Sequence, residues 1–364
     1  MDRFHECFGE VPDPRAENSQ HDLVEILFIA LLASLCGARN CSDMAEFGVA
    51  KETLLREVLT LTHGIPSHDT FSRVFRMLDP VAFEAAFRRF MTAFAVGAKI
   101  KRTKGVVALD GKALRRAYER GKSHAPSVIV TAWGAKTAMT LAAVLAPDGN
   151  EVKAAMQLVG LLQLKGCVVT GDALHCHRAM AAAIVARGGD YVLAVKGNQP
   201  GLARAAAAAL TAAGKDAKTA RTSGKGHGRE ETRIGFVAPA PGMAKSHDFP
   251  GLAALACVES RRGTDQPTRR AFLLSKRFTP EHMLDIVRTH WTIENTLHWT
   301  LDVTLDEDSA RNRKDNGPAN LAVLRRLALN VARAHPDTKT SMRRKLLRAG
   351  WDQDFLFDLI RHMR

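Results

Sequence analysis

The sequence feature that most constrains the fold is residues 279–308, TPEHMLDIVRTHWTIENTLHWTLDVTLDED. Thr279 is a suitable N-cap and Pro280 suits the first helical position, so we expect one long helix. At about 100° per residue its apolar side chains form a single stripe. The stripe contains Met283, Ile286, Val287, Ile293, Leu297 and Leu301. Glu294 falls within this stripe, and the pattern therefore predicts a carboxylate that points to the interior.

A buried carboxylate is costly unless a cation or hydrogen-bond donors meet it. Two interpretations of Glu294 follow from the helix alone. It forms a buried salt bridge with one of the many arginines, or it belongs to a site that other acids complete.

Two further acids stand where predicted strands end. Residues 105–110 read GVVALD and residues 166–172 read GCVVTGD. In open α/β sheets the strand ends are where ligands bind, and the small residues after each acid leave room for one. If the two strands are neighbours, Asp110 and Asp172 repel each other unless divalent cations separate them. Taken singly, each acid is equally typical of a turn or of a helix cap.

Together, Asp110, Asp172 and Glu294 predict a catalytic, oxygen-only site for two Mg²⁺ ions, with Mn²⁺ as a substitute. Such a pair of ions activates an attacking oxygen and stabilises the leaving oxygen of a phosphodiester. Asp302 and Asp306 stay open as alternative third acids. Basic side chains beside the acids predict contacts with backbone phosphates. They are Lys112, Arg115, Arg116, Arg288, Arg311 and Arg313.

The net charge of +14 over 364 residues is concentrated in two segments. Residues 99–122 carry +7 and residues 311–348 carry +9. Such concentration favours a nucleic-acid partner, the alternative being solvated helix faces. The six cysteines form no zinc or disulfide framework, the apolar run at 26–38 is too short to span a bilayer, and the first twenty residues lack a signal-peptide pattern. We therefore expect a cytoplasmic protein without a membrane segment.

The order of patterns along the chain predicts the domain organisation. Helical periodicity dominates the first part, short strands alternating with helices follow, and strands return before the long helix. We expect a helical N-terminal domain at 1–98 that is a candidate for DNA binding or dimerisation. An α/β core follows at 99–213 and 279–316, interrupted by a β-rich insertion at 214–278. Basic helices at 317–364 end the chain.

Several stretches, in this order, resemble the DDE-type insertion-sequence transposases, in the ISAs-type branch that includes the H-repeat-associated proteins. The stretches are VPDPRAENSQHDL, IPSHDTFSRVFRMLDP, VALDGKALRRA, VVTGDALHCHRAMA, DYVLAVKGNQPGL, GHGREETR and RTHWTIENTLHWTLDVTLDEDSARNR. The resemblance implies an α/β ribonuclease-H-like core of mixed sheet and flanking helices. It also implies that Asp110, Asp172 and Glu294 are the catalytic triad. Further DNA contacts implied by it are Lys196, Asn198, Gln199, His290 and Trp291.

The implied function is DNA transposition, in which the protein binds the terminal inverted repeats of its element as a homo-oligomer. It cleaves DNA at these ends and transfers the freed 3′-hydroxyl to target DNA. The implied location is the bacterial cytoplasm, with the nucleoid as the DNA-bound state. Two other interpretations stay open: a non-catalytic DNA-binding protein derived from a transposase, and a structure-specific nuclease without strand transfer.

Overall fold

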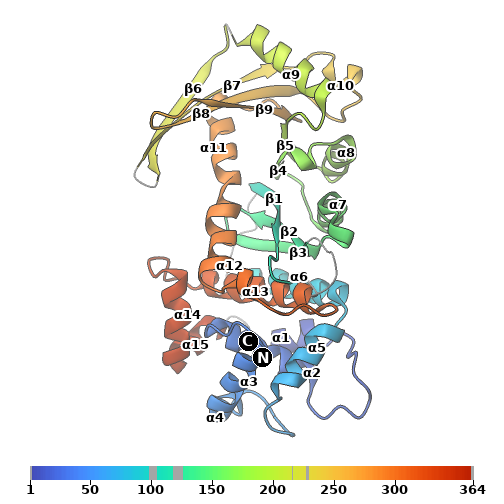
Figure 1. The fold of residues 1–364 in the computed structure, drawn as a ribbon, viewed down its shortest axis with the longest axis vertical. Coiled ribbons are helices and arrows are strands. Elements are labelled where there is room, and N and C mark those ends of the chain that lie inside the picture. The colour runs from blue at the N-terminus through green and yellow to red at the C-terminus, as the bar shows by residue number, and fades with distance from the viewer. Residues whose placement is uncertain (1, 98–104, 118–125, 215, 227–228, 362–364) are drawn as a thin grey trace.

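A nine-stranded mixed sheet runs through the molecule in the order β3-β2-β1-β4-β5-β9-β8-β7-β6 (Figure 1). The computed structural model describes residues 2–97, 105–117, 126–214, 216–226 and 229–361. The strands are β1 Val106–Ala113, β2 Val128–Gly134, β3 Met139–Leu145, β4 Val168–Gly171, β5 Asp190–Val195, β6 Thr219–Gly226, β7 Arg229–Pro239, β8 Ala254–Arg262 and β9 Thr268–Leu274.

The first five strands have the topology of a ribonuclease-H-like fold, as predicted. Strand β1 pairs antiparallel with β2 and parallel with β4, which in turn pairs parallel with β5. The predicted β-rich insertion is a continuation of this sheet, because β9 pairs antiparallel with β5. Its outer strand β6 was not predicted, since its polar, glycine-containing sequence TARTSGKG lacks an apolar alternation.

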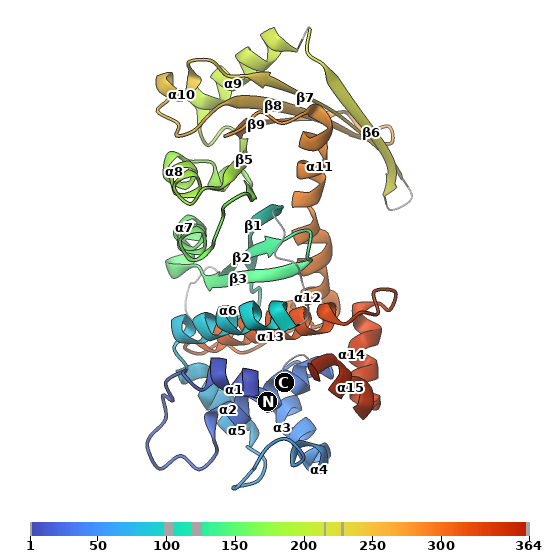
Figure 2. The same ribbon diagram turned by 180° about the vertical axis from the view of Figure 1, so that it is seen from behind.

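Helices cover both faces of the sheet (Figures 1 and 2). Those on one face are α7 Glu151–Leu161, α8 Arg178–Ala186 and α9 Pro200–Ala213. Those on the other face are α6 Pro80–Gly97, α11 Pro280–His290 and α13 Gly317–Ala334. Short helical turns connect these layers: η1 Pro147–Gly149, η2 Ala173–His175, α10 Met243–Ser246 and η4 Glu307–Ser309.

The predicted long helix is present, but it is not one regular α-helix. Helix α11 begins at the Thr279 N-cap, whose side chain accepts a hydrogen bond from the N–H of His282. A π-helical segment, Ile293–His298, follows, and α12, Trp299–Val303, continues from it. The predicted apolar stripe is buried, but in two different cores. Its first half packs in the core under the insertion strands, and its second half packs in the core of the helical region.

The remaining helices form the lower part of the molecule (Figure 2). They are α1 Asp2–Phe8, α2 Leu23–Leu35, α3 Cys41–Ala50, α4 Glu52–Leu55, α5 His68–Met77, α14 Met342–Trp351 and α15 Gln353–Ile360. Here α13 packs against α2, α5 and α6, so N-terminal and C-terminal segments share one core. None of the described helices has the length and apolar character needed to cross a membrane.

Part of the basic charge at 311–348 is internal, so that part belongs neither to a nucleic-acid-binding surface nor to solvated helix faces. Arg325, Arg326 and Lys345 are all buried. Arg326 is fully buried and forms an ion pair of 3.1 Å with Glu307, which is itself 1% exposed. These cations hold helices together and are not available to a polyanion.

We predict that Glu307→Ala lowers the free energy of unfolding by about 3–5 kcal/mol, because it leaves the guanidinium of Arg326 buried without its counter-charge. Denaturant unfolding of both proteins measures the difference. Asp285→Ala, on the exposed side of α11, is the matched control and should change little. Equal effects of the two substitutions would contradict the prediction.

Candidate active site

Asp110 lies inside β1 rather than at its end, which corrects one expectation. The strand continues to Ala113 in register with β2, whereas its pairing with β4 ends at Ala108 opposite Thr170. Side chains alternate along a strand, so Asp110 shares a face with Ala108, the face that α11 and the following helical residues 293–298 cover. The carboxylate therefore projects just beyond the last parallel pair, where the sheet opens.

Asp172 follows directly after β4, as predicted. Its side chain also caps the next turn, since Oδ1 accepts a hydrogen bond of 2.9 Å from the N–H of Leu174. The capping role proposed for this residue as an alternative is thus present, and it leaves Oδ2 free for a ligand. Strands β1 and β4 are parallel neighbours, so the condition for bringing Asp110 and Asp172 together is met.

Glu294 lies in the π-helical segment. The N–H of Trp299 bonds to the carbonyl of Glu294, five residues back, while Ile293 and Leu297 stay fully buried on either side. The side chain of Glu294 is 48% exposed, so the prediction of a buried carboxylate was wrong. The extra residue in the π turn rotates Glu294 out of the apolar stripe and toward the sheet.

All three acids line a single cavity of about 180 Å³. Its other polar lining residues are Thr170, Lys196, Arg270, His290 and Trp291. The two alternative candidates for the third acid, Asp302 and Asp306, do not line this cavity. Asp302 forms an ion pair of 2.7 Å with Lys112, and Asp306 pairs with Arg39 at 3.2 Å. Of the three candidates for the third acid, Glu294 is the one that meets Asp110 and Asp172.

The carboxylates perturb one another strongly. Burial, together with the charges of Glu294 and Asp172, raises the pKa of Asp110 to about 8. A hydrogen bond from His298 lowers the pKa of Glu294 to about 2. Without a cation, the two carboxylates therefore favour sharing one proton between them. A positive charge would relieve the mutual repulsion of these three oxygen donors. The group therefore fits a divalent cation.

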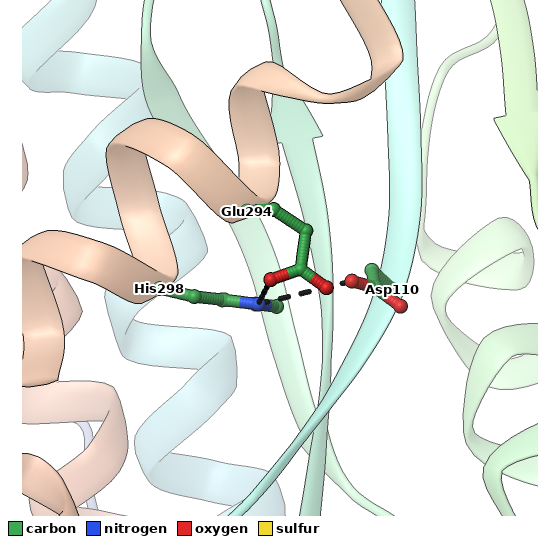
Figure 3. A group of neighbouring side chains, drawn as sticks. All are labelled: Asp110, Glu294 and His298. Carbon is green, nitrogen blue, oxygen red and sulfur yellow. Dashed lines mark hydrogen bonds and ion pairs between the residues drawn. The ribbon is translucent and has the colours of Figure 1, made fainter. Parts of the chain in front are cut away.

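His298 is the nearest side chain to this pair, and the sequence analysis missed it. Its Nδ1 lies 3.4 Å from Oε2 of Glu294 and 3.7 Å from Oδ2 of Asp110 (Figure 3). Asp110, Glu294 and His298 form the group of side chains in the described part of the chain that could hold a metal ion. The available signal was the spacing of four residues from Glu294, which places both on one side of a helix.

A fourth acid, Glu151, stands beside the site. It begins α7, and burial together with the charge of Asp172 raises its pKa. A Cβ atom on Gly111 would lie 2.1 Å from Oε2 of Glu151. The space next to Asp110 that was expected to admit a ligand is therefore occupied by this carboxylate, and a side chain at 111 would require the flexible end of Glu151 to move.

The residues predicted to contact DNA lie in separate parts of the structure. Lys196, His290 and Trp291 line the cavity of the triad. Burial lowers the pKa of His290 to about 4, and its Nδ1 lies 2.8 Å from Oγ1 of Thr170. The missed residue Arg270 lies over the ring of Trp291, 5.0 Å from its centroid. A positive charge and an aromatic ring thus meet at the rim of the site.

Two predicted DNA contacts line a second cavity of about 460 Å³, beside the first turns of α8 and α9. They are Asn198, which donates to the carbonyl of Ala173, and Gln199, which donates to the carbonyl of Cys176. These amides brace the turn after Asp172 in addition to any contact with DNA.

The basic residues around β1 are engaged within the protein. Lys112 is buried, and its ammonium lies 2.9 Å from Asp308 as well as 2.7 Å from Asp302. Arg115 is exposed and pairs with Asp308 at 3.3 Å. The remaining candidates are Arg116, whose carbonyl accepts a hydrogen bond from Arg313, and the exposed Arg288 and Arg311. Lys112 therefore joins β1 to α12, and its phosphate-binding role remains a prediction.

A ribonuclease-H-like sheet with carboxylates from β1, β4 and a crossing helix defines a class of proteins that act on phosphodiesters. The sequence comparisons specify the family. The family described as Transposase DDE domain matches residues 101–331, and the one described as DDE_Tnp_1-associated matches residues 5–91. The chain belongs to the DDE transposase family.

Individual relatives agree with this assignment. The H repeat-associated putative transposase YhhI of Escherichia coli (strain K12) is 29% identical over 374 residues, which span 99% of this chain and 98% of that protein. The putative transposase YncI of Escherichia coli O157:H7 is 30% identical over 92% of this chain and 88% of that protein. An uncharacterized protein in the dhlA 3′ region of Xanthobacter autotrophicus is 39% identical over 75% of this chain and 94% of that protein.

We predict that Asp110→Asn stabilises the metal-free protein at alkaline pH. The folded-state pKa of Asp110 is raised above the unfolded value of about 4, so its contribution to stability is complete below pH 4 and is lost as pH rises through about 8. Asparagine does not ionise, so Asp110→Asn does not lose stability in this way as the pH rises. In EDTA, the variant should exceed wild type by on the order of 3 kcal/mol at pH 9 and by much less at pH 4.

Thermal or denaturant unfolding across pH 4–9 measures this difference. Asp285→Asn, an exposed acid on α11, serves as the control. A difference between Asp110→Asn and wild type that does not vary with pH would show that Asp110 is ionised throughout.

Proposed function

We propose that this chain is a catalytically active transposase that binds the terminal inverted repeats of an insertion sequence, cleaves DNA at these ends and joins the freed 3′-hydroxyl to target DNA. The observation that carries the proposal is the convergence of Asp110, Asp172 and Glu294 on one cavity whose rim carries Lys196 and Arg270. A non-catalytic descendant has no need to keep three mutually repelling carboxylates together.

Asp110, Asp172 and Glu294 would hold two Mg²⁺ ions, with Mn²⁺ as a substitute. Bound there, the ions supply Lewis-acid activation of the attacking oxygen and charge stabilisation of the leaving oxygen. In end cleavage, water attacks the phosphorus and the 3′-oxygen leaves. In strand transfer, that 3′-hydroxyl attacks a target phosphodiester, and one new phosphodiester forms as one breaks.

The other residues of the cavity bind and orient DNA in this proposal. The ammonium of Lys196 and the guanidinium of Arg270 neutralise phosphates on either side of the reacting one. His290 is neutral near pH 7, because its pKa is about 4, so it contributes a hydrogen bond to Thr170 and not a charge. The ring of Trp291, backed by Arg270, offers a flat surface for a base or sugar.

The proposal predicts Mg²⁺-dependent nicking of a labelled duplex that carries the terminal repeat flanking the coding sequence. Glu294→Gln should retain duplex binding and lose nicking by at least about a hundredfold, because the amide removes a negative oxygen from the site. Asp285→Asn, on the outer side of the same helix, should cleave as wild type does.

Three other outcomes have definite meanings. Specific binding of the repeat without nicking in Mg²⁺ or Mn²⁺ would identify a DNA-binding protein that has lost catalysis. Cleavage that does not depend on the terminal repeat and is not followed by strand transfer would identify a structure-specific nuclease. Undiminished nicking by Glu294→Gln would exclude Glu294 as the third acid.

A second prediction concerns Lys196, which is exposed at the cavity. Lys196→Ala should weaken binding of specific and unrelated duplexes alike, and should reduce the slope of log affinity against log salt concentration by about one. Lys165→Ala, an exposed cation in the loop between α7 and β4 and outside both basic segments, is the control. An unchanged slope for Lys196→Ala would place the DNA backbone elsewhere.

A further inference from the structure

We infer that His298 is a metal ligand, so that the site has two unlike cation positions. One is formed by Asp110, Glu294 and the imidazole of His298. The other is formed by carboxylate oxygen alone, from Asp110 and Asp172. The inference rests on the proposed metal-dependent function and adds to it a nitrogen donor and a metal preference.

The separations between donor atoms fit a shared ion better than hydrogen bonds. Two ligands held at about 2.1 Å from one ion lie about 3.0 Å apart when adjacent and about 4.2 Å apart when opposite. The distances of 3.4 Å and 3.7 Å from Nδ1 to Glu294 and Asp110 fall between these limits. A good N–H···O hydrogen bond is shorter, about 2.9–3.0 Å. All three donor atoms lie within 4.8 Å of one another.

Neither tautomer of the His298 imidazole satisfies both neighbouring carboxylates by hydrogen bonding. His298 is 6% exposed, and its Nε2 is buried without a hydrogen-bond partner in the described part of the chain. One Nδ1–H can serve only one of the two carboxylates that Figure 3 shows in front of it. The other tautomer turns a lone pair toward both carboxylates, which is repulsive unless a cation lies between them. A shared cation would meet the lone pair of Nδ1 and both carboxylates at once, with the proton of the imidazole on the buried Nε2.

The backbone supports this placement. Glu294 and His298 are the second and last residues of the π-helical segment, which is closed by the bond from the N–H of Trp299 to the carbonyl of Glu294. Ile293 and Leu297, which precede these two residues, are fully buried and fix the segment against the helical core. The wide turn therefore presents two potential ligands side by side toward β1. Single π turns inside helices are frequent at functional sites.

A mixed set of two carboxylates and one imidazole has a consequence for metal preference. Imidazole binds transition metals better than it binds Mg²⁺ or Ca²⁺, which prefer oxygen. The Asp110–Glu294–His298 position should therefore select Mn²⁺ or Co²⁺, while the Asp110–Asp172 position accepts Mg²⁺.

Pulsed electron paramagnetic resonance of Mn²⁺ bound to the full chain, without DNA, tests the inference directly. We expect a ¹⁴N coupling from a directly bound imidazole, converted to the ¹⁵N pattern when the protein contains ¹⁵N-histidine. The coupling should vanish in His298→Gln and persist in His290→Gln, a histidine of the same cavity whose Nδ1 contacts Thr170. If His298→Gln does not fold, the same ¹⁵N shift in labelled His290→Gln still shows that a histidine other than His290 binds the ion.

Titrations provide a second readout. His298→Gln should weaken Mn²⁺ binding by more than about tenfold and leave Ca²⁺ binding within about threefold, because the glutamine still offers an oxygen. A purely structural role of His298 would weaken both ions equally.

The outcomes separate this inference from the proposed function. Mn²⁺ that binds wild type but not Asp110→Asn, and that shows only oxygen ligands, would overturn the role of His298 and leave the metal site standing. A ¹⁴N coupling retained in His298→Gln would also overturn it. Mn²⁺ that binds wild type and Asp110→Asn equally well would remove the metal site itself.

Discussion

One helix is anchored in two hydrophobic cores, and the candidate site depends on that double anchoring. Before Glu294, Met283 and Ile286 are buried against the insertion strands. After it, Leu297 and Leu301 are buried against the helical region. The carboxylate lies where the helix passes from one core to the other, so the packing of both holds it beside Asp110. Neither core alone would fix its position.

The same packing holds the three carboxylates together despite their mutual electrostatic repulsion. Carboxylates from β1, the end of β4 and the helix surround one small cavity, and burial together with the charges of Glu294 and Asp172 raises the pKa of Asp110. Lys112 does not line this cavity, and its buried ammonium instead joins β1 to Asp302 and Asp308 on the helical side. The folded chain thus holds an excess of negative charge in readiness for cations.

Much of the fold followed from the sequence, because apolar periodicity and strand-ending acids are local signals. The helix cap at Thr279, the strand that carries Asp110 and the strand before Asp172 were predicted in this way. The pairing of β1 with β4 was posed only as a condition, and the convergence of the three acids depended on it. The π-helical segment was not, since it arises from the competition between two cores for one helix. The helical periodicity of 100° per residue therefore led to the wrong prediction that Glu294 is buried. His298 and Arg270 were missed because their proximity to the site depends on tertiary packing.

The basic residues show the same limit of prediction from sequence. The sequence shows how many cations a segment carries, but not that Arg326 is internal or that Lys112 pairs with two aspartates. Composition favoured a nucleic-acid partner for the two basic segments, but several of their cations form structural ion pairs. The cations that line the cavity, Lys196 and Arg270, lie outside those segments.

The measurement that tests the central claim most directly is anomalous diffraction from crystals soaked in Mn²⁺. The account predicts two peaks in the cavity, both within bonding distance of Asp110, one shared with Asp172 and the other with Glu294. Peaks confined to other parts of the molecule, with the three carboxylates in contact with solvent alone, would contradict it.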